Sequence, residues 1–271
     1  MSQDQYTPSK LEIATHAVLP LLLMLLIEMA LNHFSGIPNS IFISPYLLAF
    51  FITGAIAFVV LWKGQICPGQ KGRLTFILPF LLVFALGHLV YLVAFTPKHS
   101  PMLVASCAAL IFPLIYWKLP EDETIYRTLI YCGLAIVAVG VVQYLMVYWV
   151  EIPSLFNWAR ANNFAQLQLG ILLAGWYLVL ARSRLEGFLK LLVQLALLAL
   201  IANYIWTVFV LYQHLQRMPT MAISPYLLFF AGQFVILAML GWLLLGKNIK
   251  QPTAWTVATF LSLLYPLINA V

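Results

Sequence analysis

The sequence predicts an all-α integral membrane protein, a polytopic helical bundle that crosses the bilayer about nine times. Hydrophobic residues make up 63% of the 271-residue chain and charged residues only 8%. A soluble domain has about 45–50% apolar and about 25% charged residues. Apolar stretches of about 20 residues, the length that spans a hydrocarbon core, recur to the last residue. A signal peptide alone does not explain this composition.

Each apolar segment, taken in order, is a candidate span. The segments are 11–33, 43–62, 74–95, 102–117, 128–150, 164–181, 191–212, 225–246 and 252–271. The fourth is short and contains Pro113, and local bilayer thinning tolerates a short span. Because only short loops join the segments, we interpret residues 1–271 as a single transmembrane domain.

The basic residues predict the orientation of the chain. If the N-terminus is cytoplasmic, the cytoplasmic segments contain eleven of the 14 basic residues: Lys10, Lys63, Lys71, Arg73, Lys118, Arg127, Arg182, Arg184, Lys190, Lys247 and Lys250. The opposite side contains only Lys98, Arg160 and Arg217. Because basic residues are concentrated in cytoplasmic loops, the N-terminus is predicted to be cytoplasmic and the C-terminus to lie on the outer side.

Charge and cysteine content exclude several classes of function. The net charge is +6, but the basic residues stand singly between apolar runs, so no nucleic-acid partner is expected. Cys67, Cys107 and Cys132 have no CxxC spacing, and we expect neither a disulfide framework, nor a bound metal, nor a cofactor. The short loops favour a bacterial inner membrane protein.

The hexapeptide Ile-Ser-Pro-Tyr-Leu-Leu occurs twice, at 43–48 and at 223–228. Serine is a good N-cap and proline suits the first helical position, so both copies predict a helix start at the outer membrane boundary. Ser100 and Pro101 predict a third start of the same kind. The alternative is a duplication of three-helix units, 11–95 and 191–271, because many transporters are built from internal repeats.

Polar side chains inside the spans predict a binding pocket. Such residues are costly in lipid and usually face the bundle interior or a water-filled cavity. Placed by depth, most lie in the outer half of their spans. We therefore predict one polar pocket open to the outer side. Its candidate substrate-binding residues are Glu28, Asn32, His33, His88, Gln143, Arg160, Gln166, Asn203 and Gln233.

Glu28 is the only carboxylate deep in a span. Ionised and alone it would cost several kcal/mol, so we expect it to be protonated or paired with His33 or His88. Asn32 lies one turn away on the same helix face. Two interpretations stay open: a hydrogen bond that joins helices, or a substrate or proton site. A metal site from these groups lacks the local ligand spacing of known sites.

The loop "EIPSLFNWARANN" (151–163) is amphipathic. One interpretation is that it lies flat on the bilayer surface. The other is that it covers the pocket, with Arg160 suited to a phosphate or carboxylate.

Two fragments resemble intramembrane enzymes. "DETIYR" (122–127) is similar to the Glu-Glu-x-x-x-Arg pattern of CAAX-type intramembrane proteases, but Ala199 stands where a histidine would be needed. "GHLVYLVAF" (87–95) is similar to a stretch of the lysoplasmalogenase family of multi-helix lipid hydrolases. The aspartates of that family have no counterpart here, because no span contains Asp. No Ser-His-Asp set and no phosphate-binding loop is recognised in the sequence.

The sequence therefore favours a membrane protein that binds and translocates a small or lipid-like substrate. Two alternatives are an intramembrane lipid-modifying hydrolase that uses Glu28 with a histidine, and a non-catalytic subunit of a membrane complex. The expected partners are membrane lipids, the substrate, and either a membrane-protein partner or a second copy of the chain.

Overall fold

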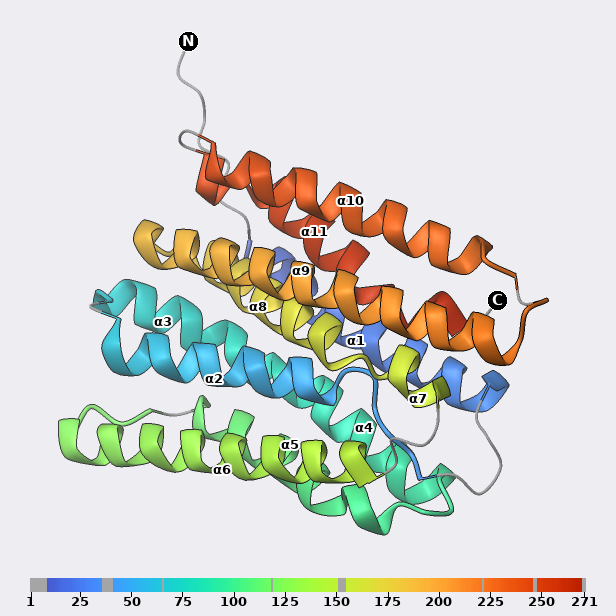
Figure 1. The fold of residues 1–271 in the computed structure, drawn as a ribbon. Helices are drawn as coiled ribbons and strands as arrows, with labels where there is room; N and C mark the ends of the chain where they lie inside the picture. Colours follow the sequence, from blue (N-terminus) through green and yellow to red (C-terminus); the bar gives the residue numbers. More distant parts are fainter. Residues whose placement is uncertain are drawn as a thin grey trace.

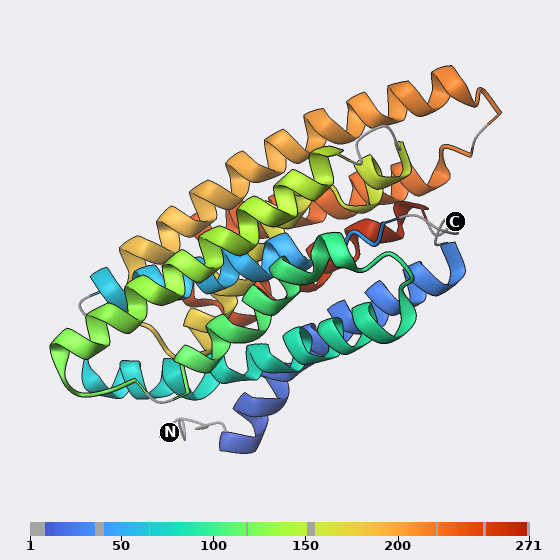
Figure 2. The same cartoon turned by 90° about the horizontal axis from the view of Figure 1, so that it is seen from below.

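The computed structural model describes residues 9–35, 41–64, 66–117, 119–150, 155–220, 222–245 and 248–269. Within these ranges the chain forms helices and no strand, so the predicted all-α class is confirmed. Long helices pack as an elongated bundle with their axes roughly along one direction (Figures 1 and 2).

The helices follow the predicted segments in order. They are α1 (Lys10–Ser35), α2 (Leu47–Lys63), α3 (Pro68–Ile77), α4 (Leu82–Phe95), α5 (Leu103–Ile115), α6 (Glu123–Val150), α7 (Leu155–Arg160), α8 (Asn163–Leu180), α9 (Glu186–Arg217), α10 (Ser224–Leu244) and α11 (Pro252–Leu263). Short 3-10 helices are η1 (Leu78–Leu81), η2 (Ser100–Met102), η3 (Asn248–Lys250) and η4 (Tyr265–Asn269). In the described part of the chain, six helical segments are long and apolar enough to cross a membrane, and α2 and α5 are shorter apolar helices.

The third predicted span begins earlier than its apolar run. The helix starts at Pro68 rather than at residue 74, because proline suits the first turn of a helix even where the following residues are polar. Pro79 then lies in η1, which joins α3 to α4. Its missing N–H explains why this joint is a 3-10 turn instead of continuous α-helix.

The helix α8 forms the centre of the bundle. It packs against α2, α9 and α11. In the segment that contains α8, 72% of the most apolar 18-residue stretch is buried, compared with 28% in α1 and in α10. Gly170 lets α2 approach closely, because a Cβ at this position would lie 2.6 Å from the carbonyl oxygen of Ala49. Small residues allow such close contact between membrane helices.

The predicted cytoplasmic loops lie at one end of the bundle. The Lys71 ammonium group is 3.8 Å from the centre of the Tyr126 ring. Nearby, Arg73 Nε donates to the carbonyl oxygen of Ala181 at 2.8 Å. These contacts bring the starts of α3 and α6 and the end of α8 together. The predicted topology places these three loops on the same side of the membrane, so the contacts agree with it. We call the opposite end, where α1 ends and α2 begins, the outer end.

The two copies of the hexapeptide start helices differently. Ser44 Oγ accepts hydrogen bonds from the backbone N–H groups of Tyr46 at 3.2 Å and of Leu47, the first residue of α2, at 3.1 Å, so the expected serine contact is present. The expected helix start is wrong by two residues, because α2 begins at Leu47 and Pro45 precedes it. Neither Ser224 nor Ser100 caps its helix with a side-chain hydrogen bond, so that expectation is wrong for both. Their prolines still occupy the first turn, which accounts for the shared pattern.

The tyrosines of the two copies also differ in their partners. The Tyr46 hydroxyl donates to the carbonyl oxygen of Leu263 at 2.7 Å. The Tyr226 hydroxyl is 2.5 Å from Nδ1 of His214. The relation between the two three-helix units stays a prediction.

Candidate functional site

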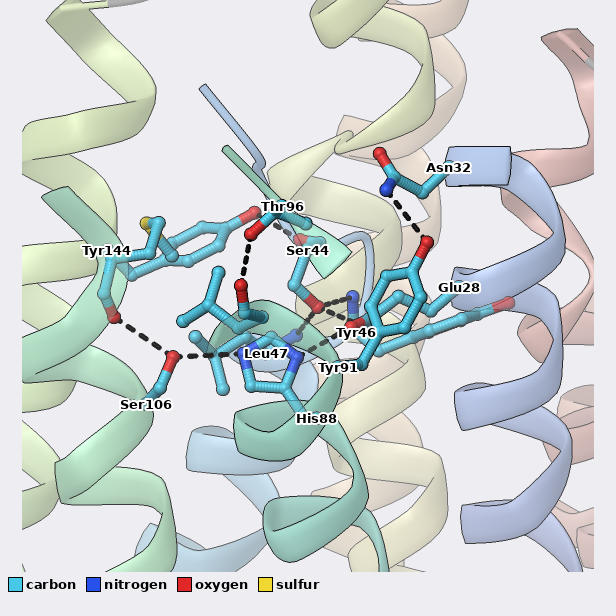
Figure 3. A network of polar contacts seen from close by, with 12 residues as sticks. Glu28, Asn32, Ser44, Tyr46, Leu47, His88, Tyr91, Thr96, Ser106 and Tyr144 are labelled. Carbon is cyan, nitrogen blue, oxygen red and sulfur yellow. Dashed lines mark hydrogen bonds and ion pairs between the residues drawn. The ribbon is translucent and has the colours of Figure 1, made fainter. Parts of the chain in front are cut away.

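Glu28 of α1 and His88 of α4 form a buried pair in the outer half of the bundle. Oε1 of Glu28 is 2.6 Å from Nδ1 of His88, and both side chains are 0% exposed (Figure 3). Of the two expected partners, His88 is therefore the one that pairs with Glu28. His33 is exposed at the end of α1. Within the described ranges, no three His, Cys, Asp or Glu side chains form a group that could hold a metal ion.

Two serines extend the pair on either side. Ser44 Oγ donates to Oε2 of Glu28 at 2.5 Å while it caps α2. On the other side, Nε2 of His88 lies 3.0 Å from Ser106 Oγ, which donates to the carbonyl oxygen of Met102 at 2.9 Å. Figure 3 shows this chain of contacts from α5 through α4 to α1 and the start of α2.

The direction of these bonds leaves one proton between Glu28 and His88. Where the Ser106 hydroxyl donates to the Met102 carbonyl oxygen, it accepts from Nε2–H of His88. One proton lies between Oε1 of Glu28 and Nδ1 of His88, because two lone pairs would repel each other at 2.6 Å. The pair is then either an imidazolium with a carboxylate or a neutral imidazole with a carboxylic acid. If that proton leaves, Nδ1 must take the remaining ring proton, and the Ser106 hydroxyl must turn towards Nε2.

Aromatic rings surround the histidine. The ring of Phe84 stacks on His88 with centroids 5.6 Å apart, and Phe42 lies at 5.9 Å. An apolar surround lowers the local dielectric, which strengthens interactions between polar groups and penalises an unpaired charge. The hydrogen bonds of the pair are therefore shielded from water.

A cavity of about 470 Å³ lies at the outer end between α1 and α4. Asn32, His33 and Tyr91 contribute its polar lining. Asn32 Nδ2 donates to the Tyr91 hydroxyl at 2.8 Å. Asn32 is one turn beyond Glu28, and Tyr91 is one turn beyond His88, so this hydrogen bond lies between the cavity and the buried pair (Figure 3).

Arg160, the last residue of α7, brings a positive charge to the same region. Its side chain is 5% exposed, and its charge interacts with Glu28, Tyr91 and Tyr265. α7 packs against η4 and α9. The interpretation that this loop lies flat on the membrane surface is therefore wrong for Arg160, because its side chain is buried in the bundle. Residues 151–154 lie outside the described residues.

Hydrogen bonds to two backbone carbonyls fix the start of α2. Tyr144 donates to the carbonyl oxygen of Ser44 at 3.0 Å, and Tyr265 donates to that of Pro45. Gln166 Nε2 donates to the Tyr144 hydroxyl at 2.6 Å, while its Oε1 accepts from a backbone N–H of α2 at 2.9 Å. Gln166 is thus connected to the Glu28 site through the start of α2 rather than by direct contact.

The remaining predicted residues lie elsewhere. Asn203 of α9 donates to Gln168 Oε1 at 3.2 Å, and Gln168 donates to Gln233 of α10 at 3.1 Å. Asn162 donates to Asn203 Oδ1 at 2.6 Å and caps α8. This ladder of buried amides joins α8, α9 and α10. The sequence had led us to expect one pocket that contains Glu28, Asn203 and Gln233. The structure instead places Asn203 and Gln233 in a separate group of hydrogen-bonded amides.

Gln143 also has a packing contact. Its Nε2 donates to the carbonyl oxygen of Pro101 in η2 at 2.9 Å, and the side chain is only partly buried. The bond attaches the start of the α5 segment to α6. This hydrogen bond of Gln143 goes to η2 and not to the Glu28–His88 pair.

Ser44 and Ser106 are the site residues that the sequence did not reveal. Serine occurs in many apolar helices and at many helix starts, so its type carries little signal. The signal that could have revealed Ser106 is its depth in the membrane. His88 lies about two turns before the end of α4, and Ser106 lies about two turns after the start of η2, which follows α4 in the chain. In two antiparallel helices joined by a short loop, these two positions lie at the same depth.

Comparisons with known proteins agree with this architecture. An uncharacterised protein of Haemophilus influenzae is 32% identical over 188 residues, which cover 68% of this chain and 69% of the relative. No solved structure matches the chain. A protein family described as an integral membrane domain matches residues 7–271, and the chain therefore belongs to this family of integral membrane proteins.

Proposed function

We propose that the protein binds a small or lipid-like substrate from the outer side and moves it across the membrane in a proton-linked cycle. The observation that carries this proposal is the fully buried Glu28–His88 pair, which holds one proton between two titratable groups. Ionisable residues inside a membrane domain are rare and usually belong to substrate or proton pathways.

The pair has two states that differ by one charge. With the proton, the pair is neutral; without it, the pair is negative and faces the positive charge of Arg160. The change also reaches the backbone, because Ser44 binds the carboxyl group and caps α2 at the same time. Proton loss therefore reorients the Ser106 hydroxyl on α5 and changes the charge beside the Ser44 contact at the start of α2, which is the kind of linkage that a transport cycle needs.

The cavity at the outer end supports an outward-facing entrance. It is bordered by Asn32 and His33, and the Asn32–Tyr91 hydrogen bond closes it towards the proton-binding pair. Glu28, Asn32, His33, His88, Arg160 and Gln166 remain our proposed substrate-binding or proton-binding residues. We assign Gln143, Asn203 and Gln233 to helix packing.

The test uses proteoliposomes with an imposed pH gradient. Three fluorescent probes, a labelled phosphatidylglycerol, a labelled phosphatidylcholine and a labelled lysolipid, are followed by quenching from outside. We expect the wild type to move at least one probe faster with the gradient than without it, and Glu28→Gln to lose this response. Glu123→Gln is the matched control, because Glu123 is exposed and paired with Arg127. Identical gradient responses in wild type and Glu28→Gln would refute the proton-linked role.

A second candidate function has its own observation. Ser106, His88 and Glu28 are spaced like the nucleophile, base and orienting carboxylate of a hydrolase, at 3.0 and 2.6 Å. In a lipid hydrolase, Ser106 Oγ would attack an acyl carbonyl, His88 would take its proton and return it to the leaving group, and water would release the acyl chain. Transport is favoured because Ser106 is fully buried and its hydroxyl donates to its own helix.

Ser106→Ala separates the two functions. The variant removes the nucleophile but keeps the Glu28–His88 contact. A lipid hydrolase would lose the release of fatty acid from a bacterial lipid extract, measured by mass spectrometry. A transporter would leave the extract chemically unchanged in both wild type and variant.

A further inference from the structure

One buried hydroxyl at the outer end has no protein partner. Tyr148, in the last turn of α6, is 2% exposed, and within the described part of the chain its hydroxyl makes no hydrogen bond. Its ring stacks on Tyr144 with centroids 6.4 Å apart, and it interacts electrostatically with Tyr265. Buried hydroxyl groups almost always have a partner. A ligand atom that accepts its hydrogen would supply one.

The positive charge of Arg160 faces the same tyrosines. It interacts with Tyr265 and Tyr46, whose rings meet edge to face with centroids 6.1 Å apart. A guanidinium group has five N–H donors in a planar fork, so it binds a phosphate or carboxylate while it keeps other contacts. Arg160 and Tyr148 are both close to Tyr265, because α7 packs against η4 and both residues have electrostatic contact with this tyrosine. They thus provide a charge and a hydroxyl donor on two sides of Tyr265.

An apolar groove begins beside Tyr265. It has a volume of about 340 Å³ and lies between α10 and the α11–η4 segment, lined by residues that include Phe229, Gly232 and Leu261. Leu228 at its edge is 76% exposed, so the groove opens on the surface that faces lipid. Its shape and lining suit an acyl chain entering from the membrane.

We propose that this site binds a lipid with an anionic head group. A phosphate or carboxylate oxygen of the head group lies between Arg160 and the Tyr148 hydroxyl, and an acyl chain occupies the groove between α10 and η4. The charge of Arg160 selects an anion, and the groove selects an acyl chain over a free anion. This inference rests on the proposed function, because it names the substrate class that the outer end receives.

Equilibrium binding without a pH gradient tests the site. The full-length protein in uncharged detergent is titrated with phosphatidylglycerol, with a diacylglycerol of the same chains, and with inorganic phosphate, and complexes are counted by native mass spectrometry. We expect phosphatidylglycerol to bind best. Tyr148→Phe removes only the hydroxyl, so binding should weaken about 2- to 10-fold. Arg160→Gln should remove the preference for phosphatidylglycerol over diacylglycerol.

A pair of glycine variants tests the groove. A Cβ at Gly232 or at Gly241 meets nothing within 4 Å, so both positions of α10 accept a larger side chain. Gly232 lines the groove and Gly241 does not. Gly232→Phe should weaken phosphatidylglycerol binding at least 10-fold, whereas Gly241→Phe should bind like the wild type.

Three results would overturn the proposal. The first is that Tyr148→Phe binds phosphatidylglycerol as well as the wild type does. The second is that Gly232→Phe and Gly241→Phe bind it equally. The third is that inorganic phosphate binds as well as phosphatidylglycerol, which would show that the acyl chains contribute nothing. If the binding losses occur but Glu28→Gln still responds to a pH gradient, the lipid site stands and the proton-linked function fails. If Glu28→Gln loses that response while binding is unaffected by Tyr148→Phe, the function stands and the lipid site fails.

Discussion

Replacing His88 by leucine isolates the proton shared with Glu28. Leucine fills most of the space of the imidazole, but it leaves the Glu28 carboxyl group without its partner at 2.6 Å. Breaking a buried ion pair by removing one partner costs about 3–5 kcal/mol. We expect a loss of about 3–5 kcal/mol at pH 7.

Reversible unfolding in mixed micelles with increasing SDS, carried out at pH 7 on the variant and the wild type, measures the difference in the free energy of unfolding.

Glu28→Gln provides the control. The amide oxygen of Gln can accept from Ser44, and its NH₂ group can donate to Nδ1 of His88, so both contacts survive. We expect a loss below about 1.5 kcal/mol. A loss in His88→Leu as small as that in Glu28→Gln would refute the reasoning that the two buried side chains depend on each other.

Three further predictions test packing and orientation. Gly170→Ala puts a Cβ 2.6 Å from a backbone carbonyl oxygen of α2, so it should cost about 1–3 kcal/mol in the same unfolding assay, whereas Gly232→Ala should be close to neutral. Asn203→Leu breaks the amide ladder and should cost about 0.6–1.7 kcal/mol for each lost hydrogen bond while gradient-driven transport persists; loss of transport at unchanged stability would return Asn203 to the substrate site. Cys67 is exposed at the predicted cytoplasmic end, so in a variant with no other cysteine an impermeant maleimide should label it in inverted vesicles and not in intact cells; the opposite result would reverse the orientation.

Membrane physics explains why the fold was predictable. Each backbone N–H and C=O in the hydrocarbon core must be satisfied inside its own segment, so a long apolar run has few alternatives to a helix. The central position of α8 was harder to foresee. Its apolar run resembles the others in length, and its distinguishing features are the polar residues Gln166 and Gln168, which are buried by α2 on one side and by α9 and α10 on the other.

The site was predictable only in part, because sequence gives depth along a helix more readily than rotation about its axis. A deep carboxylate needs a partner near its own level, which limited the candidates for Glu28 to His33 and His88, and the structure shows that the partner is His88. Gln166 and Gln168 are at nearly the same depth, but two residues of helix turn the side chain by about 200°. They therefore join different networks, and Asn203 follows Gln168 away from the Glu28 site.

The anchoring of α2 restricts how this bundle can change shape. The carbonyl groups of Ser44 and Pro45, just before α2, accept hydrogen bonds from tyrosines of α6 and η4, so a shift of this segment would have to break those bonds or move α6 and η4 with it. No comparable bond from the start of α2 reaches the α9–α10 hairpin within the described residues, where Tyr226 and His214 fasten the two helices to each other. A rocking motion would therefore move the α9–α10 hairpin relative to α2, α6 and η4. The helix α8 lies between these two groups and contacts both α2 and α9.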